Sequence, residues 1–111
     1  MQVKILYFRG CPNWRKAAER TRTVLNELGR ADAALELVDV HGIADLPRDW
    51  AGSPTVLVDG RDPFANGDLP ASRDACRIYR TAAGLEGAPS LDELRSALGV
   101  ASQPGERKER S

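Results

Sequence analysis

Near its beginning the chain changes its hydrophobic period, and this change constrains the fold more than any other feature of the sequence. Val3–Phe8 reads VKILYF, a nearly unbroken apolar run rich in strand formers, as is typical of a buried central strand. After residues 10–12, Gly-Cys-Pro, apolar side chains recur at helical spacing over residues 14–28. The sequence therefore predicts a strand followed by a helix, with Pro12 as the first helical residue and Gly29 as the left-handed cap.

The segments after this helix continue the alternation of strands and helices. Ala34–Val40 alternates in polarity and predicts a second strand, and the strand–helix–strand order predicts a parallel pair with a right-handed crossover. Pro47 allows at most a short helical turn before a third strand at Thr55–Asp59, which ends in an Asp-Gly turn signal. We therefore expect an α/β domain, a four-stranded mixed sheet with helices on both faces. Its remaining parts are a long loop at 61–73, a fourth strand at Cys76–Thr81 and a last helix at Leu91–Leu98, which starts with a Ser90–Glu93 capping box and stops at Gly99.

The composition is that of an ordinary folded domain. The length of 111 residues suits one domain, which we place at residues 1–99, since a core of this size stabilises a fold without metal or disulfide. Residues 100–111 end in SQPGERKERS, which has no apolar side chain, so we expect a disordered tail there. The 16 basic residues balance the 16 acidic ones, which argues against binding to nucleic acid or to an anionic membrane surface. No apolar run is long enough to span a membrane and no signal pattern starts the chain, so we expect a cytoplasmic protein whose thiols stay reduced.

Cys11 is the residue whose position most strongly indicates chemistry. A cysteine at a helix N-terminus faces unpaired backbone N–H groups and the positive end of the helix dipole, and both stabilise the reactive thiolate. Arg9 adds to this effect if its side chain points toward the sulfur. A dithiol enzyme of the Cys-x-x-Cys type has its second cysteine one helical turn on, where this chain has Trp14. Cys11 therefore predicts monothiol chemistry, with another thiol supplied from elsewhere.

The chain has one other cysteine, Cys76, at the predicted start of the fourth strand. It is the candidate second thiol, but burial in the core is the commoner fate of a strand cysteine, and entry from the long loop would place it at the far end of the sheet from Cys11. The single histidine, His41, is expected at the surface. A lone histidine does not make a metal site, so we expect no metal and no other cofactor. The aspartates in and beside the long loop are candidate proton donors, with turn and solvent roles as the alternative: Asp59, Asp62 and Asp68.

Two motifs give the chain a resemblance to a known superfamily. GCPNW at residues 10–14 falls at the predicted helix start, and GSPT at residues 52–55 falls at the start of the third strand. In position and order they resemble the active-site and cis-proline motifs of the thioredoxin superfamily. The resemblance implies that Pro54 is cis and lies against Cys11, and that the backbone of Ser53 pairs with a bound thiol peptide. It also implies a substrate site formed by Pro12, Trp14, Ser53, Pro54 and Thr55.

The resemblance spans residues 1–99 and, more narrowly, is to small actinobacterial-type thioredoxin-like proteins that are often labelled alkylmercury lyase. It implies thiol–disulfide redox chemistry or the binding of thiol conjugates through Cys11, with a low-molecular-weight thiol or a protein thiol as the partner. Two alternatives stay open. In a mercury-handling protein or alkylmercury lyase, Cys11 and Cys76 are soft ligands and a loop aspartate donates a proton. In a non-catalytic thioredoxin-like binding module, neither thiol reacts.

Overall fold

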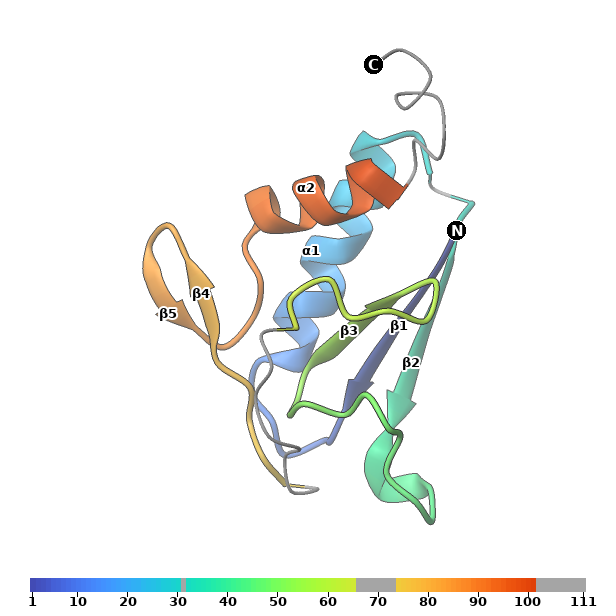
Figure 1. Cartoon of the computed structure of the whole chain (residues 1–111), viewed down its shortest axis with the longest axis vertical. Helices are drawn as coiled ribbons and strands as arrows, with labels where there is room; N and C mark the ends of the chain where they lie inside the picture. Colours follow the sequence, from blue (N-terminus) through green and yellow to red (C-terminus); the bar gives the residue numbers. More distant parts are fainter. Residues whose placement is uncertain (31, 66–73, 102–111) are drawn as a thin grey trace.

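The structure of the protein, a computed structural model, describes residues 1–30, 32–65 and 74–101. The predicted tail beyond Ala101, and the part of the predicted loop that contains Asp68, lie outside the described residues. Figure 1 shows a sheet on one side of the molecule, helices beside it and a small hairpin on the far side. In chain order the elements are β1 (Gln2–Tyr7), α1 (Trp14–Glu27), β2 (Ala34–Asp39), the 3-10 helix η1 (Val40–Gly42), β3 (Thr55–Val58), β4 (Tyr79–Thr81), β5 (Gly84–Glu86) and α2 (Leu91–Ala101).

Three of the described strands form the central sheet, in the order β2-β1-β3. β1 pairs in parallel with β2, with Ile5 opposite Leu37, and antiparallel with β3, with Ile5 opposite Val56. The parallel pair predicted from the strand–helix–strand order is therefore confirmed, and the protein has an α/β fold with a mixed sheet. The middle position of β1 explains its nearly unbroken apolar sequence, because a central strand is covered on both faces.

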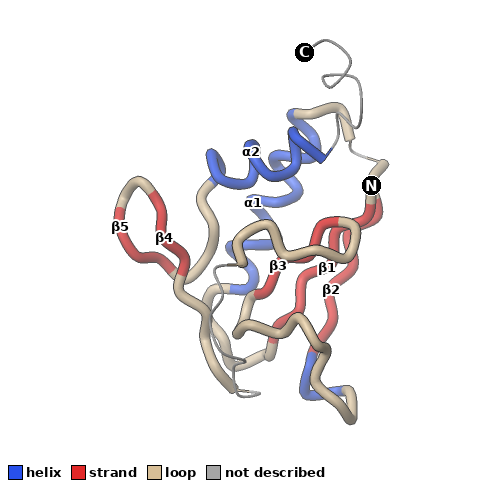
Figure 2. Tube along the Cα trace, in the orientation of Figure 1, coloured by secondary structure: helices blue, strands red, loops and turns tan. Residues whose placement is uncertain are grey.

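The α-helices α1 and α2 pack on the same face of this sheet (Figure 2). Buried side chains of the helices and the sheet form a helix-side core there: Val3, Ile5, Ala18, Val24, Leu25, Val56, Val58, Leu94 and Leu98. The opposite face carries a second core: Leu6, Phe8, Cys11, Val40, Trp50 and Leu57. Within the described residues no α-helix covers this second face, to which only the 3-10 helix η1 contributes, through Val40, so the prediction of helices on both faces is wrong for the α-helices. Between β2 and β3, Pro47 permits only a turn, in which Trp50 N–H donates to the Pro47 carbonyl at 3.0 Å, and this irregular segment covers the second core.

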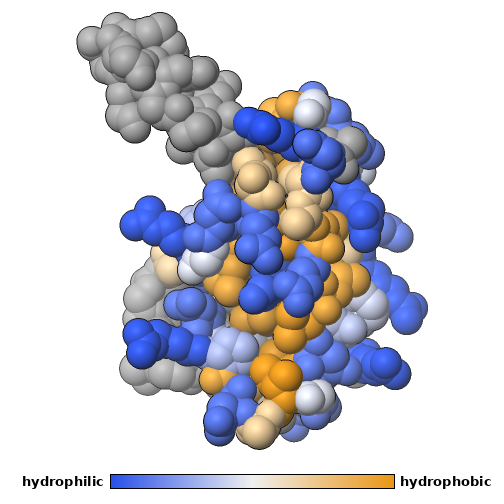
Figure 3. Space-filling model, turned by 90° about the vertical axis from the view of Figure 1, so that its right-hand side faces the viewer, coloured by the Kyte–Doolittle hydropathy of each residue, from blue (hydrophilic) through white to orange (hydrophobic). Residues whose placement is uncertain are grey.

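Seen from the side of β2, the surface shows apolar side chains gathered between hydrophilic ones (Figure 3). Leu37 of β2 is 37% exposed, and the partly buried Val38, Ile43 and Leu46 pack against the second core. The second core is thus covered by single side chains and a turn, whereas α1 and α2 cover the helix-side core.

The predicted fourth strand does not join the central sheet within the described part of the chain. β4 pairs antiparallel with β5, with Arg80 opposite Leu85, and the two form a separate hairpin that projects away from the sheet (Figure 1). The first part of the predicted strand makes only an isolated parallel bridge, between Cys76 and Ser53. The central sheet has three described strands instead of four because β4 pairs with the segment that directly follows it in sequence.

α1 begins later than the sequence predicted, and its C-terminal end has the predicted glycine cap. The helix begins at Trp14, so Pro12 and Asn13 form a turn before it, and the prediction that Pro12 is the first helical residue is wrong. Gly29 has a φ of 72°, which confirms the predicted left-handed cap.

The capping box predicted for α2 is confirmed. Ser90 N–H donates to the Glu93 carboxylate and Glu93 N–H donates to Ser90 Oγ, both at 3.1 Å. The helix then continues through Gly99 to Ala101, beyond its predicted end. None of the helices in the described ranges is both long and apolar enough to cross a membrane.

Candidate two-thiol site

Cys11 lies in the turn that leads from β1 into α1. Its N–H donates to the Phe8 carbonyl at 3.1 Å, and its side chain belongs to the second core, so the residue is only 3% exposed. Its sulfur accepts a hydrogen bond from the Asn13 N–H at 3.4 Å, and its thiol donates to the Ser53 carbonyl at 3.5 Å. The amide donor expected for this cysteine is therefore present, but it comes from the turn before the helix.

Cys76 lies beside Cys11 in space. Its segment pairs with Ser53: Ser53 N–H donates to the Ala75 carbonyl at 2.8 Å, and Arg77 N–H donates to the Ser53 carbonyl at 2.9 Å. Ser53 thus contacts both cysteines, because its carbonyl also accepts the Cys11 thiol at 3.5 Å, and both cysteines are free thiols. Cys76 is exposed, so the expectations that it is buried and that it lies far from Cys11 are both wrong.

The surroundings of Cys76 favour its protonated form. Loss of water around the sulfur raises the pKa of the Cys76 thiol, and the neighbouring Cys11 raises that pKa further. The thiolate of Cys76 therefore forms less readily than that of an ordinary surface cysteine, although the residue is accessible to a partner.

The Ser53–Pro54 peptide bond, which lies beside both thiols, is cis, as the resemblance implied. Ser53, Pro54 and Thr55 are all buried, and Thr55 Oγ1 donates to the Gly52 carbonyl at 2.5 Å. These side chains form the floor of the site. The backbone of Ser53, which the resemblance assigns to a bound thiol peptide, is already paired with the protein's own Cys76 segment. Contact of these residues with a substrate stays a prediction.

The other expected site residues surround the buried thiol. Pro12 is exposed, and Trp14 is half-buried, packing against the second core and stacking on Tyr7 with 4.2 Å between ring centroids. The side chain of Arg9 is 83% exposed and lies 3.4 Å from Asp39. Arg9 is thus engaged by a carboxylate and does not supply the positive charge expected at the sulfur.

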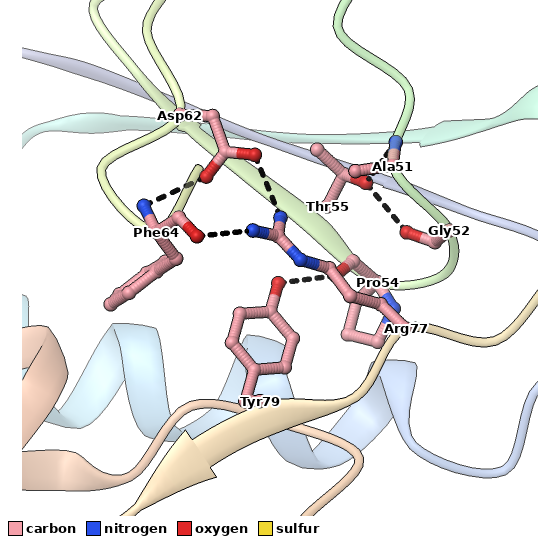
Figure 4. A network of polar contacts seen from close by, with 8 residues as sticks. All are labelled: Ala51, Gly52, Pro54, Thr55, Asp62, Phe64, Arg77 and Tyr79. Atoms are coloured by element: carbon pink, nitrogen blue, oxygen red, sulfur yellow. Dashed lines mark hydrogen bonds and ion pairs between the residues drawn. The ribbon is translucent and has the colours of Figure 1, made fainter. Parts of the chain in front are cut away.

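A buried ion pair next to Cys76 is the part of the site that the sequence did not predict (Figure 4). Arg77 Nη1 lies 2.8 Å from Asp62 Oδ2, Arg77 Nη2 donates to the Phe64 carbonyl at 2.7 Å, and the guanidinium lies 4.6 Å over the Tyr79 ring. Asp62 is therefore an ion-pair partner. One feature of the sequence could have indicated this ion pair. Arg77 and Tyr79 are two residues apart, so in an extended segment both side chains lie on the same face, which here is the inward one.

The remaining candidate groups have structural partners. His41 Nε2 lies 2.5 Å from Asp74 Oδ1, and its ring stacks on Phe8 with 5.5 Å between centroids. Asp59, after the end of β3, accepts the Gln2 N–H at 2.8 Å. Within the described ranges, no group of three or more His, Cys, Asp or Glu side chains is placed to hold a metal ion.

No family model, curated protein or solved structure matches the chain. The site is therefore defined by its own geometry: two free thiols, one buried and one exposed, meet beside a cis-proline in an α/β protein.

Proposed function

We propose that the protein carries out thiol–disulfide exchange, with Cys11 and Cys76 as its two reacting thiols. One observation carries the proposal: two free cysteines from distant parts of the sequence both contact Ser53, whose carbonyl accepts the Cys11 thiol at 3.5 Å and whose backbone bridges to Cys76. A second thiol beside the first allows a mixed disulfide to be resolved within the protein. Cys76 thus supplies the second thiol that a Cys-x-x-Cys protein would have at the position of Trp14.

The difference in exposure between the two thiols assigns their roles. A partner disulfide reaches the exposed Cys76 first. The Cys76 thiolate attacks one sulfur of that disulfide, forms a mixed disulfide and releases one partner thiol, which takes up a proton. The Cys11 thiolate, which accepts the hydrogen bond from Asn13 N–H, then attacks the Cys76 sulfur, and the second partner thiol leaves. The protein gives up two electrons and two protons, and the partner disulfide becomes two thiols.

This chemistry suits a thioredoxin-like protein, and that class is part of the proposal. A cysteine before the first helix, the parallel β1–α1–β2 unit and the cis Pro54 at the start of β3 support it. The partner is a low-molecular-weight thiol or disulfide, or a protein thiol, in the reducing cytoplasm.

Trapping each half of the reaction tests the proposal. The reduced chain, Cys11→Ser and Cys76→Ser are mixed with glutathione disulfide, quenched with acid, alkylated and analysed by peptide mass spectrometry. We expect the unaltered chain to form mainly the Cys11–Cys76 disulfide, and Cys11→Ser to accumulate glutathione on Cys76. Cys76→Ser should react much more slowly, because its remaining thiol is buried. If no intramolecular disulfide forms and neither thiol takes up glutathione, the binding-module alternative is favoured instead.

The paired thiols also favour a second candidate, the binding of a soft metal ion such as mercury(II), since thiolates are its preferred ligands. Carbon–mercury cleavage further requires a proton donor at the reacting carbon. Asp62 is engaged by Arg77 and Asp59 by Gln2, and the described part of the chain shows no carboxylate hydrogen-bonded to either sulfur. The site therefore favours redox chemistry over lyase chemistry.

A further inference from the structure

Arg77 and Asp62 form their ion pair where charge is costly to bury. Their side chains are 8% and 7% exposed, with 2.8 Å between Arg77 Nη1 and Asp62 Oδ2. Removing two charges from water costs about as much as their attraction returns, so a buried pair is by itself weak evidence of a contribution to stability. The groups around the pair indicate a positional role instead (Figure 4).

The ion pair joins the loop after β3 to the segment that leads into β4. Asp62 Oδ1 accepts the Phe64 N–H at 2.8 Å, and Arg77 Nη2 donates to the Phe64 carbonyl at 2.7 Å. On its other side the guanidinium covers the ring of Tyr79, whose hydroxyl donates to the Pro54 carbonyl at 2.5 Å. The side chain of Arg77 is thus held from both sides.

The backbone of Arg77 in turn fixes Cys76. Arg77 N–H donates to the Ser53 carbonyl at 2.9 Å, and the same carbonyl accepts the Cys11 thiol at 3.5 Å. Gly52 permits this approach, because its φ is 104° and a Cβ there would lie 3.0 Å from Arg77 N. With Arg77 pointing inward, the preceding side chain, Cys76, points outward beside Cys11.

We infer that Arg77, anchored by Asp62, is a positioning residue of the two-thiol site: it holds Cys76 against Ser53 and thereby sets how readily Cys11 and Cys76 form a disulfide. This inference rests on the proposed function. Oxidation by glutathione disulfide forms the protein S–S bond, breaks that of glutathione and yields two glutathione thiols, which carry the two protons lost by the cysteines. Tighter positioning raises the effective concentration of one thiol at the other and favours the disulfide.

The equilibrium between the dithiol and the disulfide is measured in glutathione buffers with the whole chain. Arg77→Met removes the charge and every hydrogen bond of the guanidinium, and we expect the disulfide equilibrium constant to fall about tenfold, which makes the reduction potential about 30 mV less negative. Arg77→Lys retains a cation for Asp62 and should shift the equilibrium less. Arg77→Met combined with Asp62→Leu leaves no unpaired buried charge, so it should fold and still show the full shift.

Leu98→Ala is the matched control for stability. Leu98 is 0% exposed in the helix-side core, so the substitution destabilises the protein without touching the thiols and should leave their equilibrium unchanged. An equilibrium constant that is the same in the unaltered chain, Arg77→Met and the double variant would overturn the inference. So would an equal shift in Leu98→Ala.

A second readout separates the failure of this inference from that of the proposed function. The rate of Cys76 alkylation against pH is measured in the same variants. If the unaltered chain forms no disulfide at any glutathione ratio, the proposed function fails, and the alkylation profile then decides the positional role. A pKa of Cys76 that falls toward that of an ordinary thiol in Arg77→Met supports positioning by Arg77, and an unchanged pKa contradicts it.

Discussion

The Cys76 thiol is accessible to reagents, but its pKa is raised. Its rate of reaction with a small reagent therefore measures how the surroundings of the sulfur affect its ionisation. Because its pKa is raised, alkylation of Cys76 at neutral pH should be slower than that of an ordinary exposed cysteine and should keep increasing at higher pH. Cys11→Ser removes the neighbouring charge, so it should lower the pKa of Cys76. Loss of water around the sulfur, the largest cause, should keep that pKa above the ordinary value. Labelling rates with iodoacetamide over a wide pH range measure both effects.

The same labelling in denaturant gives the reference for the unfolded chain. A pKa of Cys76 that is identical in the folded and unfolded protein would contradict the contact between the thiols. A raised pKa in the folded state also links stability to pH. Its contribution to the free energy of unfolding is fully present below the unfolded-state pKa of the thiol and is lost as the pH rises through the folded-state pKa.

Among the elements, α2 has the most clearly defined start. Ser90→Ala removes the oxygen that accepts the Glu93 N–H, so the free energy of unfolding should fall by about 1 kcal/mol. Ser96→Ala, at an exposed position inside the same helix, should leave stability unchanged or raise it slightly, because alanine has the higher helix propensity. Urea unfolding of both variants measures the difference, and equal losses of stability would argue against the cap.

The segment before and within β4 shows how far an element can be predicted from its own sequence. Along residues 76–80 exposure alternates, with Cys76, Ile78 and Arg80 outward and the other two residues inward. The sequence predicted a strand at Cys76–Thr81, and of this range only Tyr79–Thr81 is a strand, β4. Its predicted place in the central sheet was wrong, because a local pattern specifies the faces of a strand and not the strand that lies beside it.

For the whole molecule, oxidation would connect the turn before α1 to the segment before β4. A disulfide between Cys11 and Cys76 closes a loop of about 65 residues, for which the chain-entropy model gives about 4 kcal/mol of stabilisation. We expect the oxidised protein to unfold at a higher urea concentration than the reduced protein, with Cys11→Ser showing no dependence on redox state. A lower midpoint for the oxidised protein would mean that the disulfide strains the fold by more than it restricts the unfolded chain.

The sequence by itself determined the features whose causes lie within a few residues of one another. The period of VKILYF predicted β1, the left-handed Gly29 predicted the end of α1, and the Ser90–Glu93 pair predicted the start of α2. The β1–α1–β2 unit followed from the order of these elements. At the site, the break before α1 indicated Cys11, and the resemblance indicated the cis Pro54.

Only the tertiary structure decided which thiol is accessible and what lies beside it. Cys76 lies near Cys11 because its backbone bridges to Ser53 and because the next residue, Arg77, forms an ion pair with Asp62. Each of these contacts joins residues that are distant in sequence. Hydrophobic period and turn residues describe the chain only locally. An arginine read in a sequence looks like a surface residue until its carboxylate partner is known, because a buried charge is tolerated only where the fold brings an opposite charge to it.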